Sequence, residues 1–228
     1  MLSPPHTPHR TAPSPPALRY TTDSEYTDRD TKAAYIGRKY APVLEGSVLD
    51  VGCGAGLLRR HVARPDLYVG IDSGAGGGVA LDLERGVLPF GDQAFDAVVC
   101  TDVLEHLEAA HAIFDECCRV SRSRVIISLP NPVRNFIAEL FAGSAGRMKY
   151  YGLPPQNPGD RHRWFFGFEE AEAFVRERAA RNAFAVEQLD SSHDGCCYWL
   201  NGKGEDVLDH PNIRRGTLWA ILHRGATP

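Results

Sequence analysis

The stretch VLDVGCGAG, residues 48–56, decides the fold of this chain. Four residues that suit a buried strand lead directly into three glycines, Gly52, Gly54 and Gly56, spaced two positions apart. Glycine loses more conformational freedom on folding than any other residue, so three of them in one short loop need a reason. A strand that breaks into a glycine loop and then a helix usually brings the backbone close to a ligand. The stretch therefore predicts a ligand site at the end of a buried strand.

Two familiar glycine loops that bind phosphate fit this spacing poorly. The dinucleotide fingerprint G-x-G-x-x-G needs its third glycine at position 57, which is Leu57 here. The phosphate loop of nucleoside triphosphatases needs Lys followed by Ser or Thr, and here Leu57 and Leu58 follow the glycines. The spacing argues against a nicotinamide-dependent dehydrogenase and leaves the ligand to be found elsewhere in the sequence.

Continuous apolar runs alternate with helical patterns up to residue 132, and a less regular region follows. The expected strands are residues 48–51, 67–72, 79–83, 94–100, 124–130, 184–190 and 215–224. The expected helices are residues 27–40, 56–65, 108–120, 133–143 and 169–182. Strands of this kind form a parallel sheet that helices cover on both faces and that binds ligands at the carboxyl ends of its strands. We therefore expect an α/β fold with a seven-stranded, mostly parallel sheet and a final antiparallel strand.

The domain organisation follows from changes in composition along the chain. Residues 1–22 are expected to be a disordered tail, because six prolines fall within the first 16 residues and few apolar residues accompany them. Residues 23–228 are expected to form one domain. The connection between its last two strands is too long for a hairpin, which predicts an insertion there. Its expected parts are a core (45–132), a cap inserted after the fifth strand (133–168) and C-terminal strands with a second insertion (184–228).

The composition excludes several classes of protein. The chain has 228 residues, of which 43% are hydrophobic, and its net charge of −4 makes a nucleic-acid partner unlikely. None of the six cysteines forms a C-x-x-C pair, which predicts reduced thiols in the cytoplasm and no zinc site. No apolar run reaches the roughly 18 residues that a membrane span needs, and the first residues lack a secretory apolar segment. The composition does not predict the oligomeric state.

Several separated motifs together resemble one family, the class I S-adenosylmethionine-dependent methyltransferases with a type 11-like domain. VLDVGCGAG is similar to the first motif of that family. The resemblance continues at matching intervals through VGID (69–72), LDL (81–83), LPFGDQAFDAVVCTDVLEHLE (88–108) and ECCRVSRSRVIISLPNP (116–132). It covers about residues 45–132 and implies a Rossmann-like fold with S-adenosyl-L-methionine as cofactor.

The resemblance implies a set of cofactor-binding residues at the carboxyl ends of the strands. Asp50 is expected to accept from loop amides and to orient the ammonium group of the cofactor. The carboxylate of Asp72 offers two acceptors for the two ribose hydroxyls. Asp82 is expected to accept from the adenine amine, Leu83 to pack on the adenine ring, and Thr101 to lie near the sulfonium. The remaining expected contacts come from the glycine loop: Gly52, Cys53, Gly54 and Gly56.

The segment TDVLEHL carries the candidate catalytic residues. If it is helical, Asp102, Glu105 and His106 lie on one face, at spacings of three and four residues. Three hypotheses stay open: His106 is a general base, the three side chains bind a divalent metal, or they cap and support the local structure. The order D-x-x-E-H is similar to the metal-binding E-x-x-E-H of some methyltransferases, including ubiquinone-pathway O-methyltransferases and a small-RNA 2′-O-methyltransferase.

Aromatic residues of the cap are candidates for substrate binding. Tyr150, Tyr151, His162 and Trp164 could enclose a small aromatic or anionic molecule or stack on nucleobases, or they could serve only to pack the cap. Upstream of the first motif, at least one of the tyrosines at positions 20, 26 and 35 is expected near the site.

The sequence thus predicts a cytoplasmic methyltransferase that acts on a small-molecule acceptor at oxygen. LPNP (129–132) resembles the N-P-P-Y signature of amino-group methyltransferases but follows the fifth strand instead of the fourth, so methylation of adenine N6 or glutamine is not expected. Two other functions stay open: a cofactor-binding accessory protein without turnover, and an RNA or protein methyltransferase. A defined acceptor cavity beside Thr101 and His106 would favour the first prediction over the accessory role.

Overall fold

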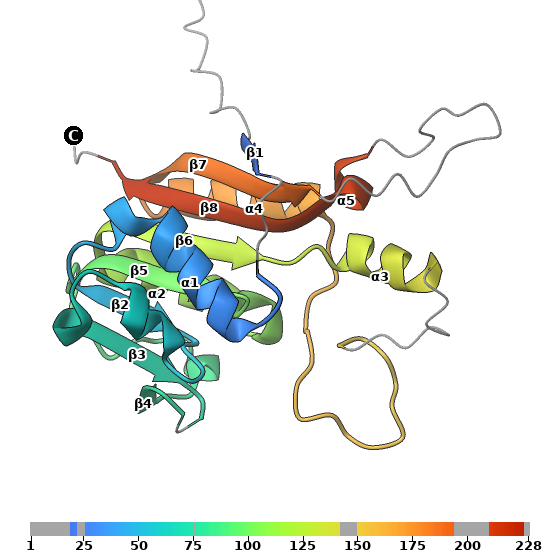
Figure 1. Cartoon of the computed structure of the whole chain (residues 1–228), viewed down its shortest axis with the longest axis horizontal. Helices are drawn as coiled ribbons and strands as arrows, with labels where there is room; N and C mark the ends of the chain where they lie inside the picture. Colours follow the sequence, from blue (N-terminus) through green and yellow to red (C-terminus); the bar gives the residue numbers. More distant parts are fainter. Residues whose placement is uncertain (1–18, 22–25, 75, 142–149, 194–209, 226–228) are drawn as a thin grey trace, which may run out of the picture.

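The computed structural model describes residues 19–21, 26–74, 76–141, 150–193 and 210–225. Its centre is one sheet in the order β1-β7-β8-β6-β5-β2-β3-β4 (Figure 1). The strands are β1 (Arg19–Thr21), β2 (Val48–Val51), β3 (Tyr68–Asp72), β4 (Val79–Ala80), β5 (Phe95–Thr101), β6 (Ser121–Leu129), β7 (Phe184–His193) and β8 (Arg215–Arg224). All neighbours pair in parallel except β8, which runs antiparallel to both β6 and β7. The predicted α/β architecture with a mostly parallel sheet is confirmed.

The sheet has one strand more than predicted among the described residues. β1 lies within the segment expected to be a disordered tail and pairs in parallel with β7, Arg19 opposite Asp190 and Thr21 opposite Ser192. Such pairing uses backbone groups alone, so a segment of low hydrophobicity can join a sheet edge without contributing to the core. Residues 1–18 of the predicted tail and 194–209 of the second predicted insertion lie outside the described residues.

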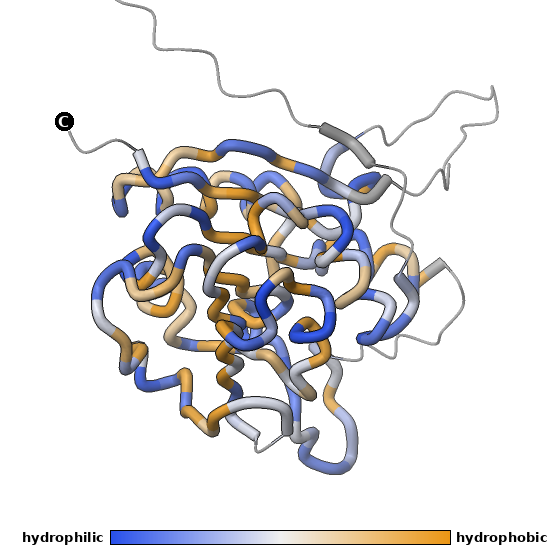
Figure 2. Tube along the Cα trace, turned by 60° about the vertical axis from the view of Figure 1, so that its left-hand side comes forward, coloured by the Kyte–Doolittle hydropathy of each residue, from blue (hydrophilic) through white to orange (hydrophobic). Residues whose placement is uncertain are grey.

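Helices cover both faces of the sheet (Figure 1). They are α1 (Arg29–Lys39), α2 (Ala110–Val120), α3 (Pro132–Phe141), α4 (Phe168–Arg181) and the single turn α5 (Pro211–Arg214). The hydrophobic segments gather at the middle of the molecule, where the strands lie (Figure 2). None of the helices in the described part of the chain has both the length and the apolar character that crossing a bilayer requires.

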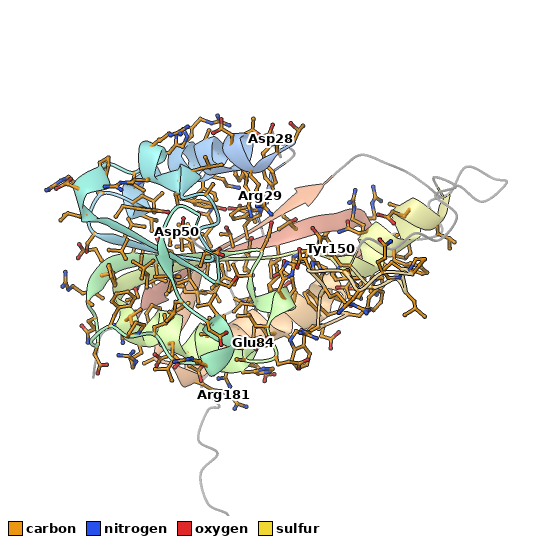
Figure 3. The ribbon with its side chains drawn as sticks, turned by 90° about the horizontal axis from the view of Figure 1, so that it is seen from below. Asp28, Arg29, Asp50, Glu84, Tyr150 and Arg181 are labelled. Carbon is orange, nitrogen blue, oxygen red and sulfur yellow. The ribbon has the colours of Figure 1, made fainter. Side chains whose placement is uncertain are left out.

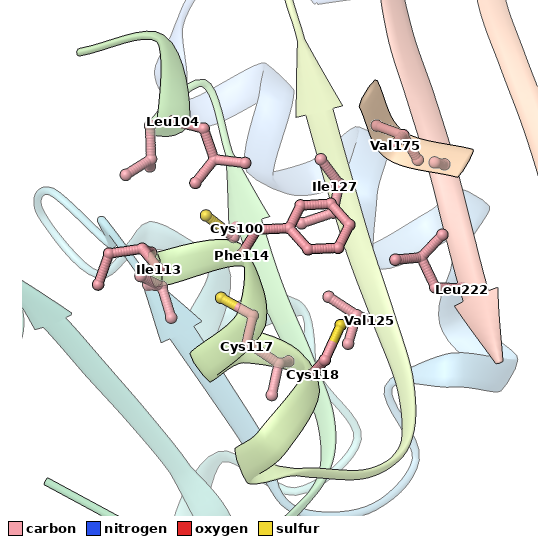
Figure 4. Packing of buried hydrophobic residues seen from close by; sticks show 14 of the residues in the cluster. Cys100, Leu104, Ile113, Phe114, Cys117, Cys118, Val125, Ile127, Val175 and Leu222 are labelled. Atoms are coloured by element: carbon pink, nitrogen blue, oxygen red, sulfur yellow. The ribbon is translucent and has the colours of Figure 1, made fainter. Parts of the chain in front are cut away.

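Alternate residues of the central strands divide between two hydrophobic clusters, as the pleat of a strand requires. Val48 and Val99 belong to the cluster beneath α1, together with Trp219. Leu49 and Val98 point to the opposite face, where the cluster includes residues of α2 and α4 (Figure 4). Cys100, Cys117 and Cys118 are buried free thiols in this second cluster, as predicted. Cys196 and Cys197 lie outside the described residues.

The prediction of one helix at residues 56–65 is wrong. The segment forms two short 3₁₀ helices, Leu57–His61 and Pro65–Leu67. Gly56 precedes them in the left-handed conformation with φ 68°, and no side chain caps the first turn. Pro65 lacks an N–H donor, so a helix that reached it would lose a backbone hydrogen bond. The predicted strand 79–83 is also shorter, because the chain turns into a 3₁₀ helix at Leu83–Arg85.

The LPNP segment has a structural role. Asn131 is buried, and its amide donates to the backbone carbonyls of Asn212 and Arg215 at 3.0 and 2.8 Å. Its Oδ1 accepts from the backbone N–H of Arg134 at 3.1 Å, in the first turn of α3. This one side chain therefore begins α3 and ties it to the start of β8, which accounts for the asparagine without a catalytic function.

Candidate active site

The glycine loop after β2 has its open side at Gly54. All three glycines have positive φ, 74° at Gly52, 55° at Gly54 and 68° at Gly56, where other residues are strained. A Cβ at Gly52 would collide with Val103, so that position is closed by packing. At Gly54 the nearest atom to such a Cβ is Nη1 of Arg29 at 3.9 Å. A ligand can therefore approach the backbone at Gly54, and the buried side of the loop is at Gly52.

A second glycine segment, between β3 and β4, packs on the first. The Gly77 N–H donates to the Gly54 carbonyl at 2.8 Å. A Cβ at Gly77 would collide with the backbone of Ala55, and one at Gly78 with the carbonyl of Gly70. Only glycines allow the two loops to meet backbone to backbone. The sequence predicted a loop here, but not that it would support the cofactor loop.

Cys53 lies beneath this second segment. Its Sγ would be 2.7 Å from a Cβ at either Gly70 or Gly78, so the thiol fills the space that those glycines leave. Burial raises the pKa of Cys53 to about 11, which makes it an unreactive neutral thiol. The side chain of Cys53 therefore packs inside the loop. The predicted contact between Cys53 and the cofactor can then involve only the backbone of Cys53.

Asp50 and Asp72 have different partners from those expected. Asp50 accepts from the Tyr68 hydroxyl at 2.5 Å instead of from loop amides. The amides of Gly54 and Gly74 donate to Asp72 instead, at 2.9 and 3.0 Å. Asp72 thus holds both glycine segments in place. Its Oδ1 also accepts from the Ser73 hydroxyl, at 3.4 Å, so the lone pair left for another donor is on Oδ2.

Asp50 is expected to make cofactor binding depend on pH. Burial raises its pKa to about 7, so the side chain is largely neutral at pH 6 and largely ionised at pH 8. Only the ionised form attracts an ammonium group, so affinity for S-adenosylhomocysteine should rise about tenfold between pH 6 and pH 8. Calorimetric titration across this range measures the effect, and Asp50→Asn should bind weakly without that slope. A wild-type affinity that does not change with pH would contradict the ammonium contact.

The three residues expected around the adenine and the sulfonium lie at the same edge of the sheet. Asp82 is exposed and accepts from the backbone N–H of Glu84 at 3.1 Å, capping the short helix that follows. Leu83 is only 5% exposed and belongs to the core, which leaves little of its surface for an adenine ring. Thr101 is the last residue of β5 and is half-buried. Their cofactor contacts stay predictions.

Asp102 has partners of its own, on α1 and β6. The segment is not an α-helix, because Asp102 has a φ of 56° and only Leu104–His106 form a 3₁₀ turn. The carboxylate of Asp102 binds Lys32 of α1 at 2.6 Å and the hydroxyl of Ser128 at 2.6 Å. The predicted helical face is therefore wrong, and Asp102 joins α1 to the sheet edge. The catalytic role of Asp102, Glu105 and His106 stays a prediction.

Glu105 and His106 remain together and gain a residue of the cap. Glu105 is buried, and its Oε2 has no hydrogen-bond partner among the described residues. Burial and the charge of Asp102 raise the pKa of Glu105 well above its ordinary range. Nε2 of His106 lies 3.9 Å from Oε1 of Glu105, and its Nδ1 lies 2.7 Å from Oδ1 of Asp160 without the alignment of a hydrogen bond. An acid and a histidine thus share one half-buried pocket.

The cap aromatics are brought to the same place. Tyr150 stacks on His162 with ring centroids 4.1 Å apart, and the His106 ring meets His162 edge-on at 4.5 Å. The Tyr151 hydroxyl donates to the Trp164 carbonyl at 2.7 Å. Trp164 in turn donates from Nε1 to the Leu107 carbonyl at 2.7 Å, so it fastens the cap to the turn. Three of the four predicted aromatics line a polar cavity of about 200 Å³ beside His106, and Trp164 lines a neighbouring apolar cavity of about 190 Å³.

One group of side chains in the described part of the chain has the spacing for a metal ion. Ligand atoms of Glu105, His106 and His162 all lie within 4.8 Å of one another. The orphaned Oε2 of Glu105 is the kind of buried oxygen that a hard divalent cation would satisfy. His162 replaces Asp102 in the predicted ligand set.

The sequence did not identify three charged residues of the site. Lys32 and Arg29 come from α1, and Asp160 from an irregular part of the cap. Burial and the charge of Asp102 raise the pKa of Tyr26 to about 12, and the expectation that an N-terminal tyrosine contacts the cofactor site stays a prediction. Tyr35 packs against Trp219.

Comparison with known proteins agrees with this arrangement. The family model for the methyltransferase domain matches residues 49–129, which contain the glycine loop, Asp72, Thr101 and His106. The domain belongs to the class I S-adenosylmethionine-dependent methyltransferases. The chain that carries this methyltransferase domain is 31% identical over 129 residues to the ubiquinone biosynthesis O-methyltransferase of Hahella chejuensis, covering 50% of this chain and 51% of that protein. The chain thus spans about half the length of the curated relatives that it matches.

Solved methyltransferase structures share the fold of the domain. A SAM-dependent methyltransferase from Archaeoglobus fulgidus has a TM-score of 0.58 at 17% identity, covering 86% of this chain and 95% of that one. The magnesium protoporphyrin IX methyltransferase of Synechocystis PCC 6803, solved with bound SAH, has a TM-score of 0.50 at 17% identity, with 86% and 83% covered. S-adenosylmethionine, the cofactor of the family, suits the open backbone at Gly54 and the spare acceptor capacity of Asp72 Oδ2.

Proposed function

We propose that the protein transfers a methyl group from S-adenosylmethionine to a hydroxyl oxygen of a small molecule. The observation that carries the proposal is the polar cavity lined by Glu105, His106, Tyr150, Tyr151 and His162. Asp102 also lines it, and this residue directly follows Thr101 at the sheet edge where the cofactor is expected. A cavity of about 200 Å³ beside that edge suits a single aromatic ring and leaves little reason for an accessory role without turnover.

The chemistry requires alignment and the removal of one proton. Methyl transfer from a sulfonium is an in-line displacement, so the cavity must hold the acceptor oxygen in line with the methyl group. A phenol or catechol hydroxyl must also lose its proton, and Nε2 of His106 faces Glu105 in the wall of this cavity. Tyr150 and His162 offer flat faces on which an aromatic acceptor can stack.

A divalent cation is the alternative means of activating the acceptor. Glu105, His106 and His162 would hold it. Bound there, such a cation would lower the pKa of a coordinated hydroxyl. The similarity to ubiquinone biosynthesis O-methyltransferases supports oxygen as the acceptor atom.

An acceptor screen tests the proposal. The protein is incubated with S-adenosylmethionine and with catechols, monophenols, amines or bulk RNA, each with magnesium and with chelator. Mass spectrometry should detect an O-methyl product from a phenolic acceptor, and the fully O-methylated form of that acceptor should give none. Product from RNA alone would contradict the proposal, as would cofactor binding without any product. Loss of product in chelator would favour the cation over His106 as the activating group.

A further inference from the structure

The turn that carries His106 is bound by the cap on both sides of that residue. The backbone carbonyl of Glu105 accepts from the backbone N–H of Arg163 at 2.7 Å. The backbone carbonyl of Leu107 accepts from Nε1 of Trp164, also at 2.7 Å. Two consecutive residues of the cap thus hold the two carbonyls that flank His106.

This turn depends on outside partners because it is short. It is a 3₁₀ turn of three residues, Leu104–His106. The N–H of His106 donates to the Val103 carbonyl at 3.0 Å. The N–H of Leu107 donates to the Leu104 carbonyl at 3.2 Å. A single helical turn with so few bonds of its own is not stable in water, since each turn must first fix several backbone dihedrals. The position of His106 is therefore set by the groups that bind the turn from outside.

Glu84 fixes the other end of the same segment. Its carboxylate accepts from the N–H groups of Glu108 and Ala109 at 3.2 and 3.1 Å, just before α2. Glu84 and the cap residue Tyr150 are well separated in Figure 3, so the two sets of bonds reach the segment from different directions. The end beside α2 is thus held independently of the cap, and the cap holds the end that carries His106.

Trp164 makes its bond to the turn from outside the polar cavity. Its ring meets the ring of His111 on α2 with centroids 5.6 Å apart, and its carbonyl accepts from the Tyr151 hydroxyl at 2.7 Å. The residue lines the apolar cavity and not the polar one. An indole N–H in apolar surroundings needs a hydrogen-bond partner, and the Leu107 carbonyl is the partner it has.

We propose that Trp164 is a positioning residue for methyl transfer, whose N–H holds the Leu107 carbonyl and thereby fixes the ring of His106 in the acceptor cavity. The same part of the cap brings the His162 ring edge-on to His106 and Asp160 to its Nδ1, so loss of the bond would change the spacing of these groups. A displacement of about 1 Å at a reacting group can cost about a hundredfold in rate. The inference rests on the proposed acceptor site and holds whether His106 acts as a base or as a metal ligand.

Two substitutions of Trp164 separate the hydrogen bond from packing. Phenylalanine keeps an aromatic ring without a donor, whereas histidine keeps a ring N–H at the corresponding position and buries less apolar surface. Trp164→Phe should lower the single-turnover rate of methyl transfer by about tenfold or more at saturating acceptor, and Trp164→His should lower it less. Packing alone would reverse this order. The reactions are run at pH 8, where an imidazole of ordinary pKa is neutral.

NMR of the histidine rings tests the same inference without an acceptor. His106→Asn identifies the signals of His106, and Trp164→Phe should shift or broaden them. The control is Arg181→Gln, which should change neither these signals nor the rate. Arg181 is exposed in the last turn of α4 and lies well away from Tyr150 in Figure 3.

The outcomes distinguish this role from the alternatives. Unchanged His106 signals in Trp164→Phe would overturn the inference, as would a faster reaction in Trp164→Phe than in Trp164→His. A higher KM for the acceptor at an unchanged rate would also overturn it and would leave Trp164 as a contact of the acceptor. A wild-type protein that gives no product from any acceptor would instead contradict the proposed function, and the His106 signals would still decide the role of Trp164. Trp164 is 38% exposed, so both variants should fold, which a thermal melt verifies.

Discussion

His106→Asn should lower the rate constant of methyl transfer by on the order of 10²- to 10⁴-fold, the usual contribution of a positioned acid or base. The substitution removes the nitrogen that faces Glu105 in the polar cavity, and affinity for S-adenosylhomocysteine should stay unchanged because the glycine loop is not touched. The measurement is single-turnover product formation with a catechol acceptor found in the screen. His223→Asn, an exposed histidine on β8, is the control.

The same variant distinguishes the two means of activating the acceptor. If His106 acts as a base, Glu105→Gln should slow the reaction less than His106→Asn, and chelator should have no effect on the wild type. If a cation is held there, both variants and His162→Asn should weaken magnesium binding in a calorimetric titration of the protein with the metal alone. Full activity of His106→Asn would show that the pocket only positions the acceptor.

Asp72→Ala should weaken the binding of S-adenosylhomocysteine on the order of a hundredfold. Two charge-assisted hydrogen bonds to ribose hydroxyls contribute at least about 1.5 kcal/mol each, or about 3 kcal/mol together. The variant also frees the amides of Gly54 and Gly74, which the carboxylate holds at 2.9 and 3.0 Å. Asp72→Asn keeps one acceptor oxygen and should give an intermediate loss.

The control for Asp72, the last residue of β3, is an aspartate just before the start of the same strand. Asp66 precedes β3, is exposed, and pairs with Arg64, so Asp66→Ala should leave affinity within twofold of the wild type. Calorimetry at pH 8 keeps Asp50 ionised during the comparison. Loss of less than threefold in Asp72→Ala would contradict the ribose contact.

The strands and the placement of the cofactor residues could be predicted because both depend on local patterns. Apolar runs mark strands that are buried on both faces, and the carboxyl ends of parallel strands meet at one edge. Asp50 and Asp72 therefore had to lie near each other. The sequence could not show that the loop amides bind Asp72 instead of Asp50, because this depends on which carboxylate the amides turn toward.

The residues around the acceptor cavity were harder to predict from the sequence, because their positions depend on contacts between distant parts of the chain. Asp102 shares a face with Glu105 and His106 only if the segment is a helix, and the left-handed backbone of Asp102 prevents this. Its actual partner, Lys32, is 70 residues away in the chain. Asp160 and His162 lie in a proline-rich segment with no period, so nothing local indicates which way they point.

The short strand β1 has a practical consequence for handling the protein. It covers residues 190–192 of β7, which is otherwise the outermost strand on that side of the sheet. A version trimmed to begin at Tyr26 would leave those backbone groups bare, and bare strand edges pair with copies of themselves. A truncation that removes residues 19–21 together with the proline-rich start would therefore expose an edge that favours aggregation, and an affinity tag is better placed ahead of the intact segment.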